Sequence, residues 1–371
     1  MGSSSGAGRP AACGASCVTL VPRRNGQICV MIHPVSALKT EITEIVTGLA
    51  MLGADTLELA LDVEPPEQLR NVDATTWQGL RTAHQGRTHD HDFLAAWNNG
   101  RAFLAARDGL RGRPPELVEW KGGHRDPGDS AVPADLRVDH VYLVSCKYLS
   151  KVLHNASPWA LFERCLVGVQ GIRSDGDWFD VVAPAEHQEL YQLARRSWGD
   201  GLELPEAVSQ LTKAQRRELR TRIPREWDDG ASRAYVRLAD AASTESARRW
   251  NHQLDSDRAR STMLWRLLRL APAPYFVLGT GPSRSVRLRV GTPWDFNQAF
   301  RVRSFQVAAQ RGGQTLVGWR AEVTELVNGQ DRTVEGHVEV RWSHGRFGGP
   351  PEAKVYLDTP HDQVPGYWPL T

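Results

Sequence analysis

The sequence predicts an α/β protein of the α+β kind, in which a mixed sheet flanked by helices is followed by a helical region and a β-rich C-terminal part. Between residues 37 and 147, an amphipathic helical stripe precedes three short strand-like segments. Residues 184–272 are rich in Ala, Leu, Arg and Glu, and from residue 275 onward short β-type runs alternate with Gly, Asn and Pro turns. The chain has 371 residues, more than the roughly 250–300 at which a single core stops growing, so several domains are expected.

Composition and cysteine usage narrow the class of protein. Hydrophobic residues make up 41% of the chain and charged residues 24%, which is typical of a globular protein. No apolar run approaches the roughly 20 residues that span a bilayer. The Gly/Ser/Ala-rich stretch at 1–25 lacks the apolar core of a secretory signal, so we expect a flexible tail there. Five cysteines without a repeated short spacing favour a reducing compartment, and we expect a cytoplasmic protein.

Beyond the tail we expect three regions, which are a core at 26–175, a helical region at 176–274 and a β-rich domain at 275–371. The core opens with a strand at 26–33 and an amphipathic helix at 37–52. The apolar positions of this helix step by three and four residues, and they are Leu38, Ile42, Ile45, Leu49 and Leu52. On a helical wheel Glu41 lies beside this apolar stripe, whereas Glu44 lies further onto the polar face.

The rest of the core reads as helices followed by strands. Residues 67–113 look mostly helical, with a polar break at 86–92. Strands are expected at 116–122, 135–138 and 141–147, and short helices at 149–154 and 160–167. The predicted order is therefore helix, strand, strand, strand, helix.

The two later regions differ in periodicity. Thr212 and Ser243 are candidate N-caps within the helical region, which Pro272 and Pro274 end. The strands expected after it are 275–278, 286–290, 300–308, 316–326, 333–342 and 353–357.

One strand pair of the core groups residues suited to phosphodiester chemistry. Asp135 opens the first strand, and Ser145 and Lys147 lie at the end of the next. In an antiparallel hairpin these two ends lie side by side, and residues two apart share one face. Asp135 and Lys147 can therefore point into the same volume. A carboxylate there suits Mg²⁺, which prefers oxygen ligands, and a compact ammonium suits an attacking water or a developing anion.

Lysine usage draws attention to the same part of the chain. Lysine occurs only at positions 39, 121, 147, 151, 213 and 354, so almost all of the 45 basic residues are arginine. Where arginine is the usual cation, a retained lysine indicates a place where a guanidinium is unsuitable. Four of the six lysines lie between residues 39 and 151.

These residues and this order of elements resemble the PD-(D/E)xK nuclease superfamily, the fold of many type II restriction endonucleases. The resemblance covers about residues 36–170 and implies a restriction-endonuclease-like core. Asp135 matches the Asp that opens the family's second strand, Lys147 matches the lysine of its third strand, and Glu41 is our match for its helical acid. The resemblance implies that Asp135 and Glu41 hold Mg²⁺ and that the protein hydrolyses DNA phosphodiester bonds as a sequence-specific endonuclease. It further implies double-stranded DNA, a homodimer and a cognate DNA methyltransferase as partners.

The sequence departs from the family pattern at Ser145, where an acid usually stands. A hydroxyl is a much weaker Mg²⁺ ligand than a carboxylate. Either Glu41 or another acid such as Glu119 completes the site, or the site has decayed. The alternative hypothesis is therefore a catalytically decayed nuclease fold that serves as the DNA-binding subunit of a defence complex. A nuclease acting on RNA or on single strands is a third hypothesis.

A second Glu-x-Lys motif lies near the C-terminus, at Glu352 and Lys354, with Asp331 or Glu339 as the earlier carboxylate. It lacks a preceding amphipathic helix in the right order, so we regard it as part of a surface that faces DNA. The net charge of +2 is small for a protein that coats nucleic acid, so affinity for phosphates must come from local clusters. Candidate DNA contacts are Arg301, Arg303, Arg341, His344, Arg346 and Lys354. The alternative for these residues is a solvated strand face.

Overall fold

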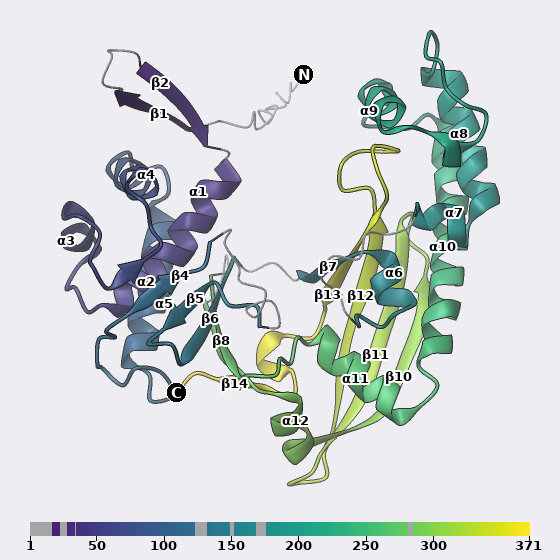
Figure 1. Cartoon of the computed structure of the whole chain (residues 1–371). Helices are drawn as coiled ribbons and strands as arrows, with labels where there is room; N and C mark the ends of the chain where they lie inside the picture. Colours follow the sequence, from purple (N-terminus) through teal and green to yellow (C-terminus); the bar gives the residue numbers. More distant parts are fainter. Residues whose placement is uncertain are drawn as a thin grey trace, which may run out of the picture.

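A computed structural model describes residues 17–22, 28–33, 35–122, 132–148, 152–167, 176–280 and 285–371 of the chain. The described part forms two lobes, each built on its own sheet (Figure 1). One sheet has seven strands and the other has five. The mixed α/β class predicted from the sequence is confirmed. None of the described helices is both long and apolar enough to cross a membrane.

The predicted tail at 1–25 lies mostly outside the described residues. Within it, β1 (Cys17–Pro22) pairs antiparallel with β2 (Ile28–His33), the strand expected at 26–33. The helix expected at 37–52 is present as three consecutive pieces, which are α1 (Val35–Glu41), the π-helix η1 (Ile42–Val46) and α2 (Thr47–Met51).

This helical segment is enclosed on two sides. All ten residues from 42 to 51 are buried. On one side Gly48 lies so close to the sheet that a Cβ there would be 2.9 Å from Val118 Cγ1. On the other, Gly100 of the helix α5 (Asp90–Ala105) lies against the backbone of Thr47, where a Cβ would be 2.1 Å from the Thr47 oxygen. The segment is therefore held between the sheet and α5.

Three further helices and the strands of the seven-stranded sheet complete this lobe. The helices are α3 (Leu57–Asp62), α4 (Ala74–Gln85) and α5 (Asp90–Ala105). The strands are β3 (Leu69–Arg70), β4 (Val118–Trp120), β5 (Leu136–Val138), β6 (Tyr142–Tyr148), β8 (Tyr275–Thr280), β9 (Ser285–Val290) and β14 (Tyr367–Pro369). These strands lie in the order β14-β9-β8-β6-β5-β4-β3. The three predicted strands β4, β5 and β6 are present, and β5 pairs antiparallel with β6 as predicted. β4 also pairs antiparallel with β5, while β8 lies parallel to β6.

The five-stranded sheet is antiparallel throughout. Its strands are β7 (Val152–Ala156), β10 (Phe300–Gln310), β11 (Thr315–Glu325), β12 (Asp331–Arg341) and β13 (Glu352–Leu357). The expected division at residue 275 is therefore not a division between sheets, because β8, β9 and β14 join the sheet of the predicted hairpin.

The helix expected at 149–154 is wrong for its described part. Residues 152–156 pair with β13 as an edge strand instead, and 149–151 lie outside the described residues.

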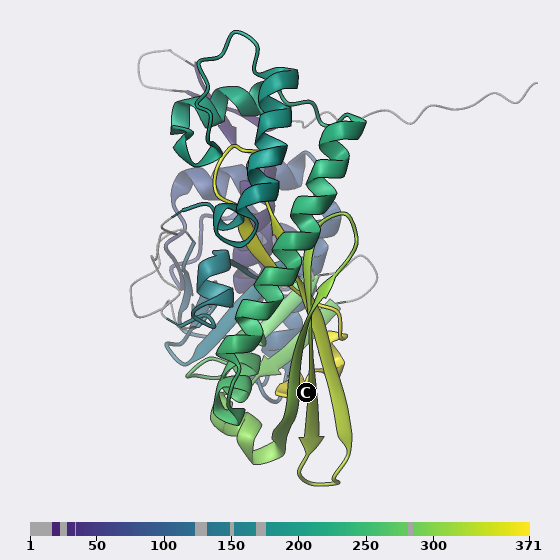
Figure 2. The same ribbon diagram turned by 90° about the vertical axis from the view of Figure 1, so that its right-hand side faces the viewer.

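Helices cover the five-stranded sheet on one face. The long helix α10 (Asp229–Gln253) runs along it, as Figure 2 shows. The other helices after residue 157 are α6 (Pro158–Phe162), α7 (Trp178–Val182), α8 (Pro184–Trp198), η3 (Val208–Gln210), α9 (Lys213–Arg222), α11 (Asp257–Leu267), α12 (Pro293–Ala299) and η4 (His361–Gln363). Thr212 is the N-cap of α9, as predicted, and it forms a capping box with Gln215. The prediction for Ser243 is wrong. This buried serine lies in the middle of α10, where its hydroxyl donates to the Ala239 oxygen and accepts from the Leu316 N–H of β11.

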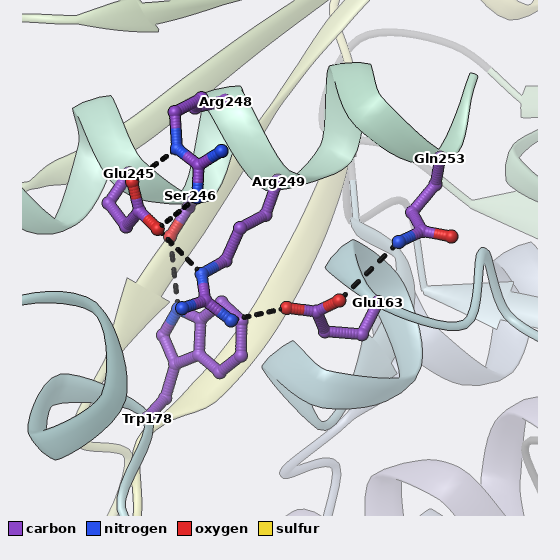
Figure 3. A network of polar contacts seen from close by, with 7 residues as sticks. All are labelled: Glu163, Trp178, Glu245, Ser246, Arg248, Arg249 and Gln253. Carbon is purple, nitrogen blue, oxygen red and sulfur yellow. Dashed lines mark hydrogen bonds and ion pairs between the residues drawn. The ribbon is translucent and has the colours of Figure 1, made fainter. Parts of the chain in front are cut away.

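A polar network ties the short helices to α10 (Figure 3). Arg249 donates to Glu163 at 2.5 Å and to Glu245 at 2.8 Å, and its guanidinium lies 5.9 Å from the centre of the Trp178 ring. The Trp178 Nε1 donates to Ser246 Oγ at 3.0 Å. One arginine thus fixes α6 and the start of α7 to the same stretch of α10.

Candidate functional site

The candidate site lies where β5 begins and β6 ends. The pairing of Leu136 with Val144 places Asp135 beside Ser145. The Asp135 N–H donates to the Val144 oxygen at 2.8 Å, and the Asp135 oxygen accepts from the Lys121 N–H at 2.9 Å. The backbone of Asp135 is therefore fixed by the strand on each side.

The side chains of Asp135, Ser145 and Lys147 meet at this point, as the hairpin register predicts. Asp135 Oδ2 accepts from Ser145 Oγ at 3.1 Å and from the Cys146 N–H at 2.8 Å. Lys147 Nζ lies 3.8 Å from the same oxygen. Asp135 is only 4% exposed and Ser145 is fully buried, whereas the Lys147 side chain is 40% exposed. The site therefore combines a buried, oriented carboxylate with an ammonium that solvent can reach.

The helical acid that lies against the sheet is Glu44. Glu44 is 9% exposed, and its Oε2 accepts from Trp120 Nε1 at 2.6 Å. The sequence places Glu44 on the polar face of the helix, but this face is buried, because α5 and the sheet together enclose this part of the helix. Glu41 ends α1 one turn earlier and is half-buried. Burial is the main reason that the pKa of the Cys146 thiol is well above its usual value, and the charges of Asp135 and Glu44 raise it further. Both acids thus act electrostatically on the residue between Ser145 and Lys147.

Glu119, the other candidate for the missing acid, has a different partner. It lies opposite Arg137 in the pairing of β4 with β5. Arg137 donates to both of its oxygens, at 2.6 and 3.0 Å, and these hydrogen bonds are the largest cause of its lowered pKa. This carboxylate therefore holds an arginine on the sheet.

Lys121, to which the sequence analysis assigns no role, lies next to the backbone of Asp135. It is 6% exposed and bonds through its backbone to the strand position that carries Asp135. Its signal in the sequence was the scarcity of lysine, because Lys121 and Lys147 both lie at this end of the sheet. Lys39, a third of the six, forms an ion pair with the buried Asp92 at 3.3 Å.

The residues at the hairpin can be compared with the needs of Mg²⁺. Across the side chains that the structure describes, no group of three or more His, Cys, Asp or Glu is arranged to hold a metal. Mg²⁺, however, is commonly bound through one or two carboxylates and completes its shell with water and substrate phosphates. Asp135 supplies one such carboxylate. The donor set fits a magnesium ion held largely by water and phosphate, with Asp135 as the anchoring ligand and Glu44 as the second acid in the neighbourhood.

A small cavity adjoins the hairpin. Its volume is about 50 Å³, and Ser145, Lys147, Arg269 and Tyr275 are among its lining residues. Burial raises the pKa of Tyr275 to about 12, and its hydroxyl donates to the Arg269 oxygen at 3.2 Å. A space of this size holds ordered water but no nucleotide. A polymeric substrate would therefore have to approach the exposed Lys147 from outside.

The candidate DNA contacts do not form one patch. Arg301, near the start of β10, pairs with Thr324, which in turn pairs with Asp331 at the start of β12. Arg341 ends β12. The start of β12, beside which Arg301 lies, and the end of β12, which carries Arg341, are ten residues apart along the strand, a distance of roughly 30 Å. Arg303 is exposed near Arg301, while His344 and Arg346 follow Arg341 in the loop that lies beside α9 (Figure 1).

The second Glu-x-Lys motif lies on β13. Lys354 pairs with Glu339 of β12, so Glu339 and not Asp331 is its neighbouring acid. Glu352 accepts from Ser343 Oγ at 2.5 Å, and His344 Nε2 lies 3.5 Å from it. The acids of this motif are thus bonded to neighbouring side chains on the surface of the sheet.

Comparison with known proteins identifies no relative of this chain. No protein-family model, no curated protein and no solved structure matches it. The function is therefore argued from the geometry of the site itself.

Proposed function

We propose that this protein is a metal-dependent endonuclease that hydrolyses DNA phosphodiester bonds at the end of the β5–β6 hairpin. The proposal rests on one observation. The buried Asp135 carboxylate and the accessible Lys147 ammonium lie next to each other, and Asp135 Oδ2 is the oxygen that faces the lysine. This pairing suits an attack on phosphate, which needs an anchor for a hard cation and a positive group beside the reacting atoms.

The roles of the residues follow from their positions. Asp135 is the metal ligand, and Ser145 and the Cys146 N–H fix the orientation of its carboxylate. When bound, Mg²⁺ would lower the pKa of a water and neutralise charge on the scissile phosphate. Lys147 stabilises the developing charge or orients the water. We assign the part of the helical acid to Glu44 in preference to Glu41, because Glu44 is the one buried against the end of β4.

The substrate and partners belong to the same proposal. Double-stranded DNA is the proposed substrate, and a homodimer of this protein cuts it with sequence preference. A cognate methyltransferase protects the DNA of the host from this cleavage. The end of β12 and the loop after it contribute Arg341 and Arg346 as candidate phosphate contacts.

A second candidate function rests on Ser145. Its hydroxyl donates to Asp135 at the strand position where an acid would strengthen a metal site. A protein with this substitution can bind DNA without cutting it, as a subunit of a defence complex. The choice between the two functions is the choice between metal-stimulated cleavage and binding alone.

The test is cleavage of plasmid DNA in Mg²⁺ and in EDTA by the wild type, Asp135→Asn and Lys147→Ala. Lys213→Ala serves as the matched control, because Lys213 is an exposed lysine on α9 in the other lobe. We expect the wild type to produce discrete DNA fragments only when Mg²⁺ is present. The rate of cleavage should fall roughly 100-fold or more in both hairpin variants and should not change in the control. Wild-type protein that binds DNA and leaves it intact would favour the binding subunit. Cleavage by both hairpin variants would refute the hairpin site.

A matched pair on the helix tests the second acid. Glu44→Gln should reduce cleavage, while Glu41→Gln should leave it near the wild-type level. The reverse order would restore Glu41, the acid that the sequence predicts.

A further inference from the structure

A larger cavity lies in the other lobe, between α9, the loop after β12 and the turn between β10 and β11. Its volume is about 450 Å³, within the roughly 300–1,000 Å³ of sites that hold small ligands. Four arginines line it against a single carboxylate, Glu339. The arginines are Arg220, Arg225, Arg341 and Arg346. The cavity therefore has a strong local excess of positive charge in a chain whose net charge is only +2.

Two of these guanidinium groups have no bonding partner among the described residues. Arg220 and Arg225 are exposed, and neither forms a hydrogen bond or ion pair with any residue that the structure describes. Arg220 is nevertheless held in place. A Cβ at Gly345 would lie 2.9 Å from its side-chain carbons, and one at Gly348 would lie 2.7 Å from its Cδ. The glycines let the loop pack directly on the arginine stem, which leaves the charged end free for a ligand.

The other two arginines are held by partners, Arg346 by an aromatic ring and Arg341 by the Glu339 carboxylate. The Arg346 guanidinium lies 3.9 Å from the centre of the Trp227 ring and donates to the Pro224 oxygen at 2.9 Å. Tyr235 and Trp342 also line the cavity, so flat apolar surfaces adjoin the cationic ones. Rings of this kind stack on nucleobases, and arginine forks bind phosphate with two parallel hydrogen bonds.

The carboxylate completes the set. Glu339 is 7% exposed, and Arg341 and the Tyr356 hydroxyl both lie 3.0 Å from its Oε2. Within the described residues its Oε1 has no further bond, so this oxygen is available to accept from a base N–H. Cationic groups, stacking surfaces and a buried acceptor thus surround one space.

We propose that this cavity binds a nucleotide, with Arg220 and Arg225 on its phosphate and the aromatic residues beside its base. The nucleotide can come from a strand of nucleic acid or from the free pool, and both sources offer the same chemistry. The site is separate from the hairpin, so the proposal stands whether or not the hairpin cuts DNA.

The test is calorimetric titration, in EDTA, with the four deoxynucleoside 5′-monophosphates, their nucleosides and inorganic phosphate. These probes contain no internucleotide bond, so the outcome does not depend on cleavage. We expect at least one monophosphate to bind roughly tenfold more tightly than its nucleoside and than phosphate. The double variant Arg220→Ala and Arg225→Ala should weaken that binding by about tenfold or more. Arg196→Ala, an exposed arginine of α8 that lines none of the described cavities, should leave it within about twofold.

Competition with a short single-stranded oligonucleotide distinguishes the two sources. Displacement of the monophosphate at lower concentration by the strand would assign the site to a nucleotide within nucleic acid, and weaker displacement would assign it to a free nucleotide. Equal affinity for inorganic phosphate and for every nucleotide would overturn the proposal, as would an equal loss in the Arg196→Ala control or the absence of saturable binding. Because the loop also packs on the Arg220 stem, the folding check is the single variant Arg225→Ala, whose thermal unfolding midpoint should match that of the wild type while its affinity for the monophosphate falls.

Discussion

At the hairpin the charged groups are bonded to one another, whereas in the arginine cavity two of four guanidinium groups have no bonded partner among the described residues. Asp135 is buried and receives hydrogen bonds from Ser145 and from a backbone N–H. Arg220 and Arg225, in contrast, stand exposed at the rim of an open space. The difference separates a site whose geometry is fixed by folding from one whose charges are left for a ligand to neutralise. Mutations at the first should reduce stability, and mutations at the second should reduce binding far more than stability.

The largest effect is expected where the support of the hairpin is tightest. Gly100→Ala places a Cβ 2.1 Å from the Thr47 oxygen and 2.7 Å from Ala50 Cβ, so α5 must move away from the helix that carries Glu44. We expect the free energy of unfolding to fall by about 1–3 kcal/mol, measured by urea denaturation. Gly79→Ala on α4 is the matched control, because a Cβ there meets nothing within 4 Å. It should gain about 0.5–1 kcal/mol from helix propensity. Equal effects of the two changes would show that the close crossing is unimportant.

The internal bonding of the hairpin is tested by Ser145→Ala. The variant removes the hydroxyl that donates to Asp135 at 3.1 Å in a fully buried place. We expect a loss of about 1 kcal/mol in the free energy of unfolding. Ser232→Ala, on the exposed side of α10, should cost at most about 0.5 kcal/mol. A stability unchanged by Ser145→Ala would break the contrast between the two regions.

The lobe that carries the arginine cavity has its own bonded network, and its pH dependence sharpens the comparison. The hydrogen bond from Arg248, followed by that from Arg249, lowers the pKa of Glu245 from 4.5 to about 2. Because the pKa in the folded protein lies below that of the unfolded chain, Glu245 contributes stability above about pH 4.5 and loses it as the pH falls toward about 2. The difference in unfolding free energy between the wild type and Glu245→Gln should therefore be constant near neutral pH and shrink below about pH 4.5. Denaturation series at several pH values measure it, and a difference that grew in acid would contradict the assignment.

The smallest effect is expected at the rim of the cavity. Arg225→Ala removes a guanidinium without a bonded partner in the described part of the chain, so the free energy of unfolding should change by no more than about 0.5 kcal/mol. Differential scanning calorimetry of Arg225→Ala and of Arg249→Ala measures the two effects on the same scale. Arg249 forms ion pairs with two carboxylates, so its replacement should lower the free energy of unfolding clearly more. A loss at Arg225 as large as that at Arg249 would mean that its charge is used inside the fold.

Much of the fold could be predicted from local pattern. The strand meander β4, β5, β6 follows from short apolar runs broken by turn residues, and the tight turn at Asp139 and His140 fixes its register. That register brings Asp135 beside Lys147, because neighbouring ends of a hairpin are close whatever the rest of the chain does. The N-cap at Thr212 is equally local, since its partner Gln215 lies three residues away.

Other features depended on contacts between distant segments. Serine is a residue type that often caps helices, but Ser243 lies within α10 and accepts a hydrogen bond from a strand residue 73 positions later in the chain. Residues 152–156 pair with β13, about 200 residues later, and no local periodicity encodes that partner. The strands after residue 275 share one type of pattern, yet β8 and β9 extend one sheet while β10 begins another.

The sequence by itself determined which residues meet at the hairpin, because a side chain's neighbours across a tight turn are set by the two-residue period of the strand. Tertiary structure alone decided which helical acid lies against the sheet. A helical wheel assumes one buried side, whereas α5 and the sheet enclose this helix from two directions and bury Glu44. The arginine cavity was likewise decided by packing, since its lining residues come from α9, α10, β12 and loops that are far apart in the chain. Their charges are visible in the sequence, but their convergence exists only in the folded protein.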